Sequence, residues 1–284
     1  MPALSLVVCV CNERDLLERL LQKAEGCYDD LVVVHDGPDE TNMRAVVEAA
    51  GGRFFEEPRA FQQEPHWPFA WGQAANDWIL KLDADEFPGE KMKVWLRQFR
   101  LAPEPAAGIS GFTCIWPFWN GRRAISNKWP PGRILVFDRR QVRFFGMVEQ
   151  AMVPDGVYQP LDLILHHQPK RKSYGLHNVL LRKQAYRWRK CIAQSLLGKP
   201  TDLPCWRWES EAWPSEWEQI RSHPWRTAVA RLTMGTLRCL RDQWRTERKL
   251  TLEAAVNAPI HHALICLKFW RLRRLHHGDM ETKF

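Results

Sequence analysis

The chain has 284 residues, of which 45% are hydrophobic and 26% are charged, a composition that excludes a disordered protein and allows one large domain or two smaller ones. No apolar run approaches the ~18 residues of a membrane span, and no basic stretch precedes the first apolar segment, so we expect neither a transmembrane helix nor a secretory signal. The net charge of +8 comes from the last part of the chain, because residues 1–169 hold 18 Lys and Arg against 23 Asp and Glu, whereas residues 170–284 hold 23 against 10.

The first part of the chain alternates strand-like and helix-like segments. Short apolar runs predict four strands, at residues 4–10, 31–35, 53–55 and 78–82. Apolar residues at helical spacing predict three helices, at residues 13–23, at 41–50 with Thr41 as N-cap, and near 68–75. This order predicts an α/β protein with a mostly parallel, doubly wound sheet and right-handed crossovers.

Beyond residue 100 the pattern changes. Strand-like segments separated by turn residues are expected at 108–119, 133–138, 142–153 and 161–166. Helices are expected at 173–197, 225–248 and 252–274, with an irregular Pro- and Trp-rich stretch at 198–224. We therefore expect two domains, an α/β domain over residues 1–170 and a basic, Trp-rich helical extension over residues 171–284.

An acidic motif follows the fourth predicted strand. Asp83 and Asp85 are two residues apart, with Glu86 next to them, and they project to the same side if the strand continues. Adjacent carboxylates repel one another unless a cation lies between them, and a hard divalent ion binds one or two carboxylates together with substrate phosphates. The alternative is a solvated acidic turn.

Two further polar loops follow neighbouring strands. Asn12 and Glu13 come after the first strand, and His35, Asp36 and Asp39 lie at the end of the second. Ligands of open α/β sheets bind at the carboxyl ends of strands, where these side chains could hydrogen-bond a nucleotide base and ribose. The alternatives are helix capping by Asn12 and ordinary turn chemistry for the aspartates.

These segments resemble family 2 glycosyltransferases of the GT-A fold, in particular the bacterial lipopolysaccharide-core and surface-glycan branch. The resemblance rests on Val7-Val8-Cys9-Val10-Cys11-Asn12-Glu13, Val32-Val33-Val34-His35-Asp36-Gly37 and Trp78-Ile79-Leu80-Lys81-Leu82-Asp83-Ala84-Asp85-Glu86. It implies a Rossmann-like catalytic domain over residues 1–170, in which Mn²⁺ or Mg²⁺ is bound by Asp85 with Asp83. It places Asn12, Glu13, Asp36 and Asp83 at the nucleotide-sugar. His35 stands where the family often has an acid, and the family's basic residue before the D-x-D strand is missing, with only Arg59 and His66 nearby.

The resemblance continues more loosely past residue 130. It involves Arg133-Ile134-Leu135-Val136-Phe137-Asp138-Arg139-Arg140, Gly146-Met147-Val148-Glu149 and His166-His167. It implies that Glu149 is the catalytic base and that His166 lies near the metal. Lys128 or Arg133 would add positive charge at the phosphates, and the loop over residues 118–132 would close over the donor. The alternatives are a salt bridge from Glu149 to Arg133 or Arg143, and structural roles for the histidines.

The resemblance thus implies a metal-dependent, inverting glycosyltransferase of cell-surface polysaccharide synthesis. It would move a sugar from a nucleotide-sugar, with a UDP-sugar favoured, to a glycan, a lipid-linked acceptor or another hydroxyl. The alternative is a non-catalytic protein that binds nucleotide-sugars or anionic glycans on a degenerate GT-A scaffold. Nucleotidyl transfer is disfavoured because no Gly-rich phosphate loop is present.

The C-terminal third combines basic residues with tryptophan. Nine of the 15 tryptophans lie beyond residue 128, and residues 263–274 are apolar with basic residues between. This composition indicates contact with an anionic membrane surface; the alternatives are a helical cap on the core and a dimer interface. We expect no nucleic-acid partner, because no nucleic-acid-binding signature occurs. Eight scattered cysteines without a CxxC spacing favour reduced thiols, and hence a cytoplasmic protein, with peripheral contact at the inner face of the membrane as an option.

Overall fold

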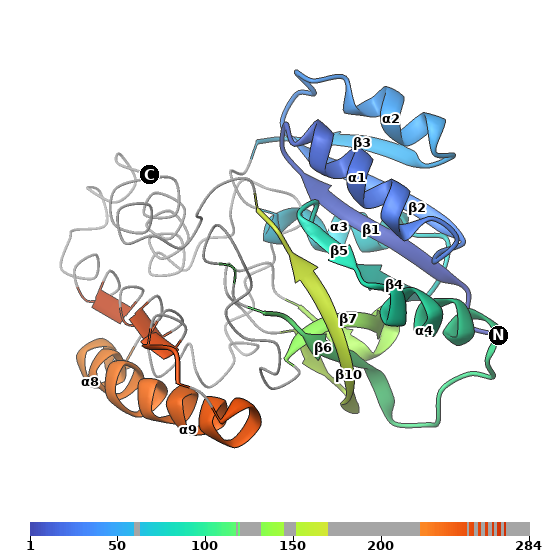
Figure 1. Ribbon diagram of the computed structural model, residues 1–284. Coiled ribbons are helices and arrows are strands. Elements are labelled where there is room, and N and C mark those ends of the chain that lie inside the picture. The colour runs from blue at the N-terminus through green and yellow to red at the C-terminus, as the bar shows by residue number, and fades with distance from the viewer. Residues whose placement is uncertain are drawn as a thin grey trace. The chain divides into compact units, whose positions relative to one another are not determined.

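The chain divides into two compact units, Met1–Arg171 and Lys172–Phe284, each described here by itself. The computed structural model (Figure 1) describes residues 1–59, 63–117, 119, 132–144, 152–169, 222–248 and 250–252, together with 255, 256, 259, 260, 263, 266, 267 and 270. The predicted helix at 173–197, nearly all of the stretch at 198–224 and most of the loop at 118–132, including Lys128, lie outside these described residues, as does Glu149.

The first unit is built on an eight-stranded mixed sheet of order β3-β2-β1-β4-β7-β6-β10-β5. Its parallel half consists of β1 (Leu4–Val10), β2 (Asp30–Asp36), β3 (Arg53–Glu57) and β4 (Trp78–Lys81). The other half consists of β7 (Arg133–Asp138), β6 (Ile109–Ile115), β10 (Val157–His167) and β5 (Glu86–Pro88). β7 is antiparallel to β4 and β6, β10 is parallel to β6, and β5 is antiparallel to β10. The predicted α/β class with a mostly parallel sheet is confirmed.

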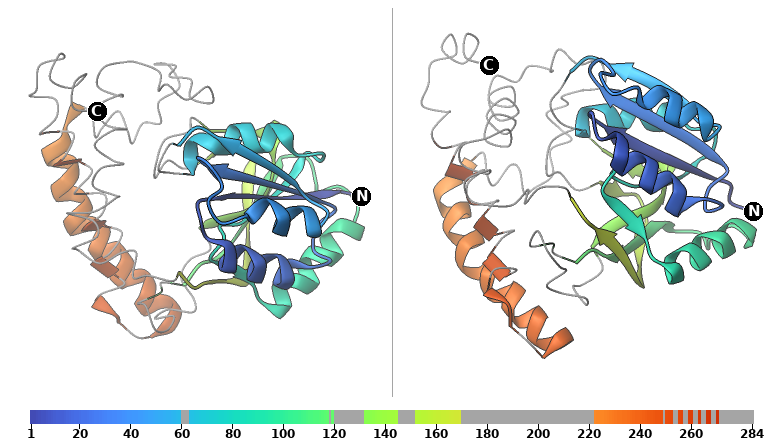
Figure 2. Two further views of the ribbon diagram at one scale, coloured as in Figure 1. Left: turned by 90° about the horizontal axis from the view of Figure 1, so that it is seen from above. Right: turned by 45° about the horizontal axis from the view of Figure 1, so that its top comes forward.

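Helices cover both faces of this sheet (Figure 2). One face packs against α1 (Arg14–Ala24), α2 (Met43–Ala49) and α4 (Glu90–Leu101), and the other against α3 (Trp67–Gln73). β1 contributes to both cores, because Leu6 and Val8 face the first while Val7 and Cys9 face the second. A strand buried on both faces reads as a continuous apolar run, which is why this part of the fold was predictable.

The sequence prediction differs from the structure in several local features. α2 begins at Met43, and its N-cap is Asn42 rather than Thr41. The side chain of Asp39 accepts the backbone N–H groups of Thr41 and Arg44 instead, and these bonds outweigh burial and lower the pKa of Asp39. Neither α4 nor β5 was predicted from the sequence. Of the strand predicted at 142–153, the structure describes the two ends, which form the antiparallel pair β8 (Val142–Arg143) and β9 (Val153–Pro154); residues 145–151 lie outside the described part.

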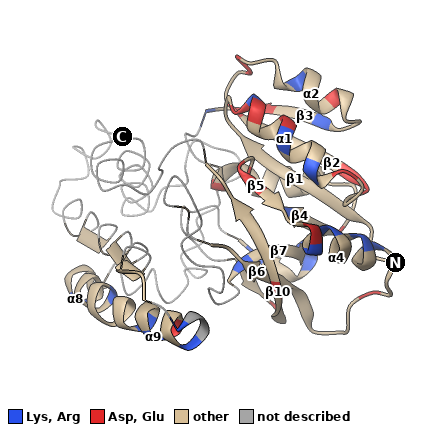
Figure 3. Ribbon diagram, viewed as in Figure 1, with Lys and Arg blue, Asp and Glu red and all other residues tan. Residues whose placement is uncertain are grey.

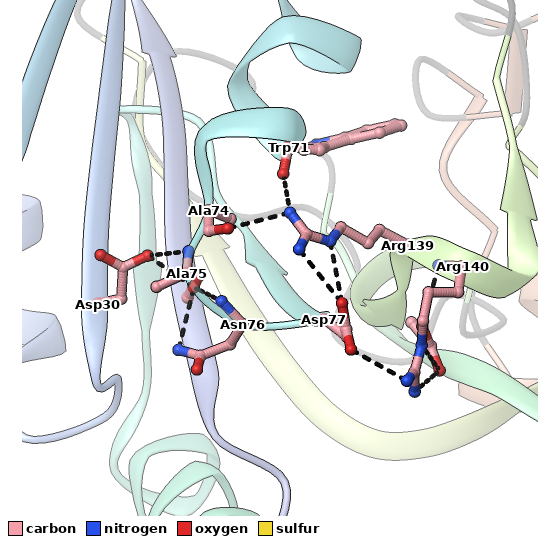
Figure 4. A network of polar contacts seen from close by, with 10 residues as sticks. Asp30, Trp71, Ala74, Ala75, Asn76, Asp77, Arg139 and Arg140 are labelled. Carbon is pink, nitrogen blue, oxygen red and sulfur yellow. Dashed lines mark hydrogen bonds and ion pairs between the residues drawn. The ribbon is translucent and has the colours of Figure 1, made fainter.

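A polar network fixes the start of β4, at the end of the sheet opposite the strand carboxyl termini (Figure 4). Arg139, just after β7, donates to the carboxylate of Asp77 (3.2 Å) and to the carbonyl oxygens of Trp71 and Ala74 (3.0 Å for Ala74) at the end of α3. Arg140 binds the other oxygen of Asp77 at 3.0 Å. One cation therefore supplies partners for the last carbonyls of a helix and anchors the residue that precedes β4.

The described part of the second unit is mainly one interrupted helix. It consists of α8 (Pro224–Ala230), a π turn labelled η4 (Arg231–Gly235) and α9 (Thr236–Glu247). The predicted helix at 225–248 is confirmed, and the individual positions described between 252 and 270 are helical as well. Within the described residues, no helix combines the length and the apolarity that a membrane crossing requires.

Gly111 and Gly72 differ in how closely other atoms approach them. A Cβ at Gly111 of β6 would lie 2.5 Å from the carbonyl oxygen of Val136, a backbone atom that cannot move aside, whereas a Cβ at Gly72 on α3 would meet nothing within 4 Å. We expect Gly111→Ala to lower the free energy of unfolding by about 2 kcal/mol. Gly72→Ala should raise it by up to about 1 kcal/mol, because Gly is a poor helix former. Urea unfolding of both variants measures this, and equal effects would contradict the packing described.

Candidate functional site

The loops after β1, β2 and β4 meet at one edge of the sheet. β1 lies between β2 and β4 and is parallel to both, so the carboxyl ends of all three strands point the same way. Val10 at the end of β1 pairs with His35, and Val7 pairs with Lys81 at the end of β4. The sequence-predicted loops that begin at Asn12, Asp36 and Asp83 therefore share one edge, as expected.

Four charged side chains at the end of β4, here called the charge cluster, neutralise one another. They are Lys81, Asp83, Glu86 and Arg133. The Nζ atom of Lys81 lies 3.4 Å from Oδ1 of Asp83, and Nη2 of Arg133 donates to Oδ2 of Asp83 at 2.7 Å. The same Nη2 atom lies 2.8 Å and 2.9 Å from the two carboxylate oxygens of Glu86, which is completely buried. Buried charges are tolerated when paired in this way.

The pKa values of the cluster follow from burial and from these pairs. Burial acts to raise the pKa of Asp83, but the positive charges of Lys81 and Arg133 outweigh it and hold the pKa at about 2. Burial raises the pKa of Glu86, and the charge of Asp83 adds to this effect against the opposing charge of Arg133. Burial together with Arg133 lowers the pKa of Lys81. Asp83 is therefore the firmly ionised anion of the cluster.

Lys81 is a member of the site that was not predicted from the sequence. Its side chain is buried, and its Nζ atom lies 3.7 Å from the centre of the Trp67 ring on α3, a cation–π contact. A lysine at the end of an apolar strand, directly before an acidic motif, was the available signal. Lysine is almost never fully buried without a partner, so the pairing of Lys81 with Asp83 could have been predicted from the sequence.

The acidic motif turns away from the strand instead of extending it. β4 ends at Lys81, and the backbone N–H of Glu86 donates to the carbonyl of Asp83 at 2.9 Å, which closes a turn. The Glu86 side chain accepts the backbone N–H of Asp83, also at 2.9 Å. The strand does not continue through the motif, so the condition under which both aspartates would project to one side is not met, and Asp83 and Asp85 have different partners. Asp83 belongs to the charge cluster, and Asp85 does not.

Asp85 faces a histidine from β10. Its Oδ2 atom lies 3.3 Å from Nε2 of His167, and the ring of His167 stacks on Trp116 with ring centres 4.3 Å apart. The backbone carbonyl of Asp85 also accepts the N–H of Gln168 at 2.8 Å, which fixes the turn against the strand. The favoured His166 is exposed and lies beside Gly89 instead. Successive side chains of a strand point to opposite faces, so only one of the two histidines can face Asp85.

A buried histidine joins the first two loops. His35 is completely buried, and its Nε2 atom accepts the backbone N–H of Asn12 at 3.1 Å while Nδ1 lies 2.7 Å from the carbonyl oxygen of Gly37. An N–H only donates and a carbonyl only accepts, so these partners fix the neutral tautomer with the proton on Nδ1. Asn12 is held in the left-handed region, with φ of 52°. Its Oδ1 atom is buried and accepts no hydrogen bond from the described part of the chain.

The two basic residues noted near the motif both reach this edge. Nε2 of His66 lies 3.0 Å from Oδ1 of Asp36, and both side chains are buried. Arg59 packs against Gly37, where a Cβ would lie 2.6 Å from its Nε atom, and its Nη1 atom donates to Sγ of Cys11 at 3.4 Å. Glu13 lies at the start of α1 and accepts the N–H groups of the first helical turn through its carbonyl.

The donor set of the site suits a divalent ion only in part. Across the described ranges, no group of three or more His, Cys, Asp or Glu side chains is placed to hold a metal. Asp85 and His167 supply one carboxylate and one imidazole, both of which are ligands for Mn²⁺. Ions of this class also bind through one or two carboxylates with the rest of the shell from substrate phosphates and water. The residues present therefore fit an ion that binds together with a phosphate-bearing ligand.

Comparison with known proteins gives a structural match. No protein-family model and no curated protein matches the sequence. The mannosyltransferase PcManGT from Pyrobaculum calidifontis, solved with GDP-Man and Mn²⁺, is similar in structure with a TM-score of 0.50 and 14% identity over 96% of this chain and 87% of that one. This chain has a GT-A-like fold. Membership of family 2 stays a prediction from the sequence.

Other solved structures match with lower scores. TarS 1-349 from S. aureus in complex with UDP has a TM-score of 0.42 and 12% identity over 95% of this chain and 91% of that one. A mycobacterial protein has a TM-score of 0.44 and 17% identity over 71% of this chain and 76% of that one.

A double-mutant cycle tests the charge cluster. Asp83→Asn removes the anion between two cations, and we expect it to lower the free energy of unfolding at neutral pH by about 3 kcal/mol. Adding Lys81→Met removes one of the two cations that pair with Asp83. The loss in the free energy of unfolding of the double variant should therefore be about 1–3 kcal/mol smaller than the sum of the two single losses. Additive effects in urea unfolding would show that the two side chains do not interact. Asp162→Asn, on an exposed position of β10, is the control.

Asp83→Asn also tests how the stability of the protein depends on pH. The pKa of Asp83 is lowered to about 2 from a usual value near 3.8, so its contribution to stability is complete above pH ~4–5 and is lost as the pH falls toward 2. The stability difference between the wild type and Asp83→Asn should therefore shrink on acidification over this range. A difference that stays constant down to pH ~2 would contradict the pairing.

Proposed function

We propose that this chain is a metal-dependent glycosyltransferase that moves a sugar from a nucleotide-sugar to a hydroxyl acceptor with inversion. The observation that carries the proposal is the separation of the two aspartates at the end of β4. Asp83 is neutralised by Lys81 and Arg133, whereas Asp85 is left to face His167. One carboxylate with an imidazole, at the carboxyl ends of parallel strands in a GT-A-like fold, suits a metal diphosphate. PcManGT, with a similar fold, is a mannosyltransferase solved with GDP-Man and Mn²⁺.

In this proposal Asp85 and His167 hold Mn²⁺ or Mg²⁺, and His167 takes the place that the sequence resemblance gave to His166. The ion, when bound, offsets the negative charge of the leaving diphosphate. Asp83 acts as a positioning residue, because both its carboxylate oxygens and its backbone N–H already have protein partners. Arg133 keeps Asp83 and Glu86 in place and adds positive charge close to the phosphates.

The nucleotide lies, in this proposal, across the loops after β1 and β2. The side-chain carbonyl oxygen of Asn12 has no hydrogen-bond donor from the described residues, and a small movement of the loop on nucleotide binding would let it accept an N–H of the base. Asp36 is paired with His66, so it shapes the pocket through that contact, and Glu13 lies at the start of α1 beside Asn12. Donor and nucleotide binding belong, in this proposal, to residues 1–170.

The transfer step needs a base on the acceptor side, and we propose Glu149 for it. The acceptor oxygen attacks the anomeric carbon, the bond between that carbon and the diphosphate oxygen breaks, and the acceptor proton passes to the Glu149 carboxylate. Attack from the side opposite the leaving group inverts the anomeric centre. This assignment comes from the sequence resemblance alone, because Glu149 lies outside the described residues.

Nucleotide release tests the assignment of Asp85. A panel of UDP-, GDP- and other nucleotide-sugars is incubated with the protein, with and without Mn²⁺. We expect metal-dependent release from one donor, reduced at least about a hundredfold in Asp85→Asn and unchanged in Asp162→Asn. Asp85→Asn with wild-type release would sink the proposal.

Calorimetry separates catalysis from binding. Metal-dependent nucleotide binding without turnover on any hydroxyl acceptor would favour the alternative, a nucleotide-sugar-binding protein on a degenerate scaffold. Absence of any nucleotide binding in the folded wild type would contradict both.

His35 offers a test of the nucleotide loops. His35→Leu removes the acceptor for the Asn12 N–H, so Asn12 loses the contact that holds its left-handed backbone. We expect nucleotide affinity to fall about tenfold, the effect of one hydrogen bond, while turnover at saturating donor changes little. His35→Gln, which retains an acceptor of similar reach, should restore most of the affinity. Equal affinities for all three proteins, measured by calorimetry, would show that His35 does not position Asn12.

A further inference from the structure

The described helix of the second unit leaves a row of large apolar side chains in contact with solvent. Between 42% and 58% of the surface of each is exposed. The row consists of Trp225, Val229, Leu232, Leu237 and Trp244. The ring of Trp225 also packs edge to face against the ring of Trp270, with centres 5.5 Å apart.

The π turn makes these residues a single row. Five turns of α-helix hold about 18 residues, so residues nineteen positions apart would differ by about 100° around an uninterrupted helix. The π turn at Arg231–Gly235 accommodates one additional residue. Trp225 on α8 and Trp244 on α9, both half exposed, therefore lie on the same side of the helix.

The buried face confirms this register. Pro224 and Gln243 are separated by the same nineteen positions, and both are buried. The side-chain amide of Gln243 donates to the backbone carbonyl of Thr251 and accepts the backbone N–H of the same residue. The residues that follow the two tryptophans, Arg226 and Arg245, repeat the spacing and are both exposed. The buried, apolar and basic rows on α8 thus continue on α9 after the π turn, whereas Met234 within the turn lies outside the apolar row.

A row of arginines runs beside the apolar row. It consists of Arg226, Arg238, Arg241 and Arg245, all exposed, and Figure 3 shows blue segments recurring along α9. In the described part of the helix the acidic partner of this row is Asp242, which pairs with Arg241 at 2.9 Å. The apolar and basic rows together are here called the amphipathic face.

We propose that the amphipathic face binds the surface of a membrane that contains anionic lipids. Half-exposed tryptophans beside a row of arginines match the boundary between headgroups and acyl chains, where indole rings are favoured and guanidinium groups meet phosphates. The excess of positive charge in this row favours this partner over an apolar protein surface, which would leave the arginines desolvated. The helix lies in the plane of the interface, since its row of arginines leaves it too polar to cross the membrane. The proposal does not depend on the transfer reaction.

Vesicle flotation of the full chain tests the proposal. The probes are vesicles of phosphatidylcholine alone and vesicles in which about a third of the lipid is phosphatidylglycerol. We expect binding to the anionic vesicles only. Leu237→Ser with Trp244→Ser should weaken it about thirtyfold or more, through lost apolar contact. Arg238→Gln with Arg245→Gln should weaken it about thirtyfold, at about a fivefold loss for each charge.

The matched control is Val94→Ser with Leu101→Ser, which removes two apolar side chains of α4 in the first unit that are 51% and 75% exposed, and should leave binding unchanged. Circular dichroism confirms that each variant folds. Equal binding by wild type and the Leu237/Trp244 variant, or no binding to anionic vesicles, would overturn the proposal. A dimer in lipid-free solution that the Leu237/Trp244 variant loses would also overturn it, in favour of self-association.

Discussion

The candidate site depends on the neutralisation of charge at the end of β4. Two cations and two carboxylates, Lys81, Asp83, Glu86 and Arg133, are placed where the central parallel strand ends and the first antiparallel strand begins. Burying any one of them alone would cost several kcal/mol, so each requires the others. This mutual requirement ties β4 to β7 and closes the turn that follows. The same contacts remove Asp83 from competition for an external cation.

The remaining features of the site follow from that arrangement. With Asp83 engaged, Asp85 is directed toward β10 and meets His167, whose ring is held by Trp116. On the other side of β1, the neutral ring of His35 connects the loops that carry Asn12 and Gly37. In the proposed function this arrangement would hold a metal beside a nucleotide, with buried side chains supporting both positions. Support of this kind lets a site hold its geometry before the ligand arrives.

The fold was largely predictable, and the site was predictable only as a set of loops. Strands buried on both faces, such as β1, produce apolar runs that are read easily, and parallel pairing then brings the loops of Asn12, Asp36 and Asp83 to one edge. The pairing of Lys81 with Asp83 and the choice of His167 over His166 depend on where β4 stops and on the register of β10. A shift of one residue exchanges the two faces of a strand, and composition does not encode that shift. α4 was missed although Met92, Leu96 and Phe99 are buried along one side of it.

Binding of Mn²⁺ followed by electron paramagnetic resonance, in the presence of UDP or GDP, tests the central claim most directly. The claim is that Asp85 carries the metal while Asp83 is held by the charge cluster. The account predicts that nucleotide-dependent Mn²⁺ binding disappears in Asp85→Asn and persists in the Lys81→Met/Asp83→Asn double variant. Persistence in Asp85→Asn together with loss in the double variant would contradict it, and would make Asp83 the metal-binding residue.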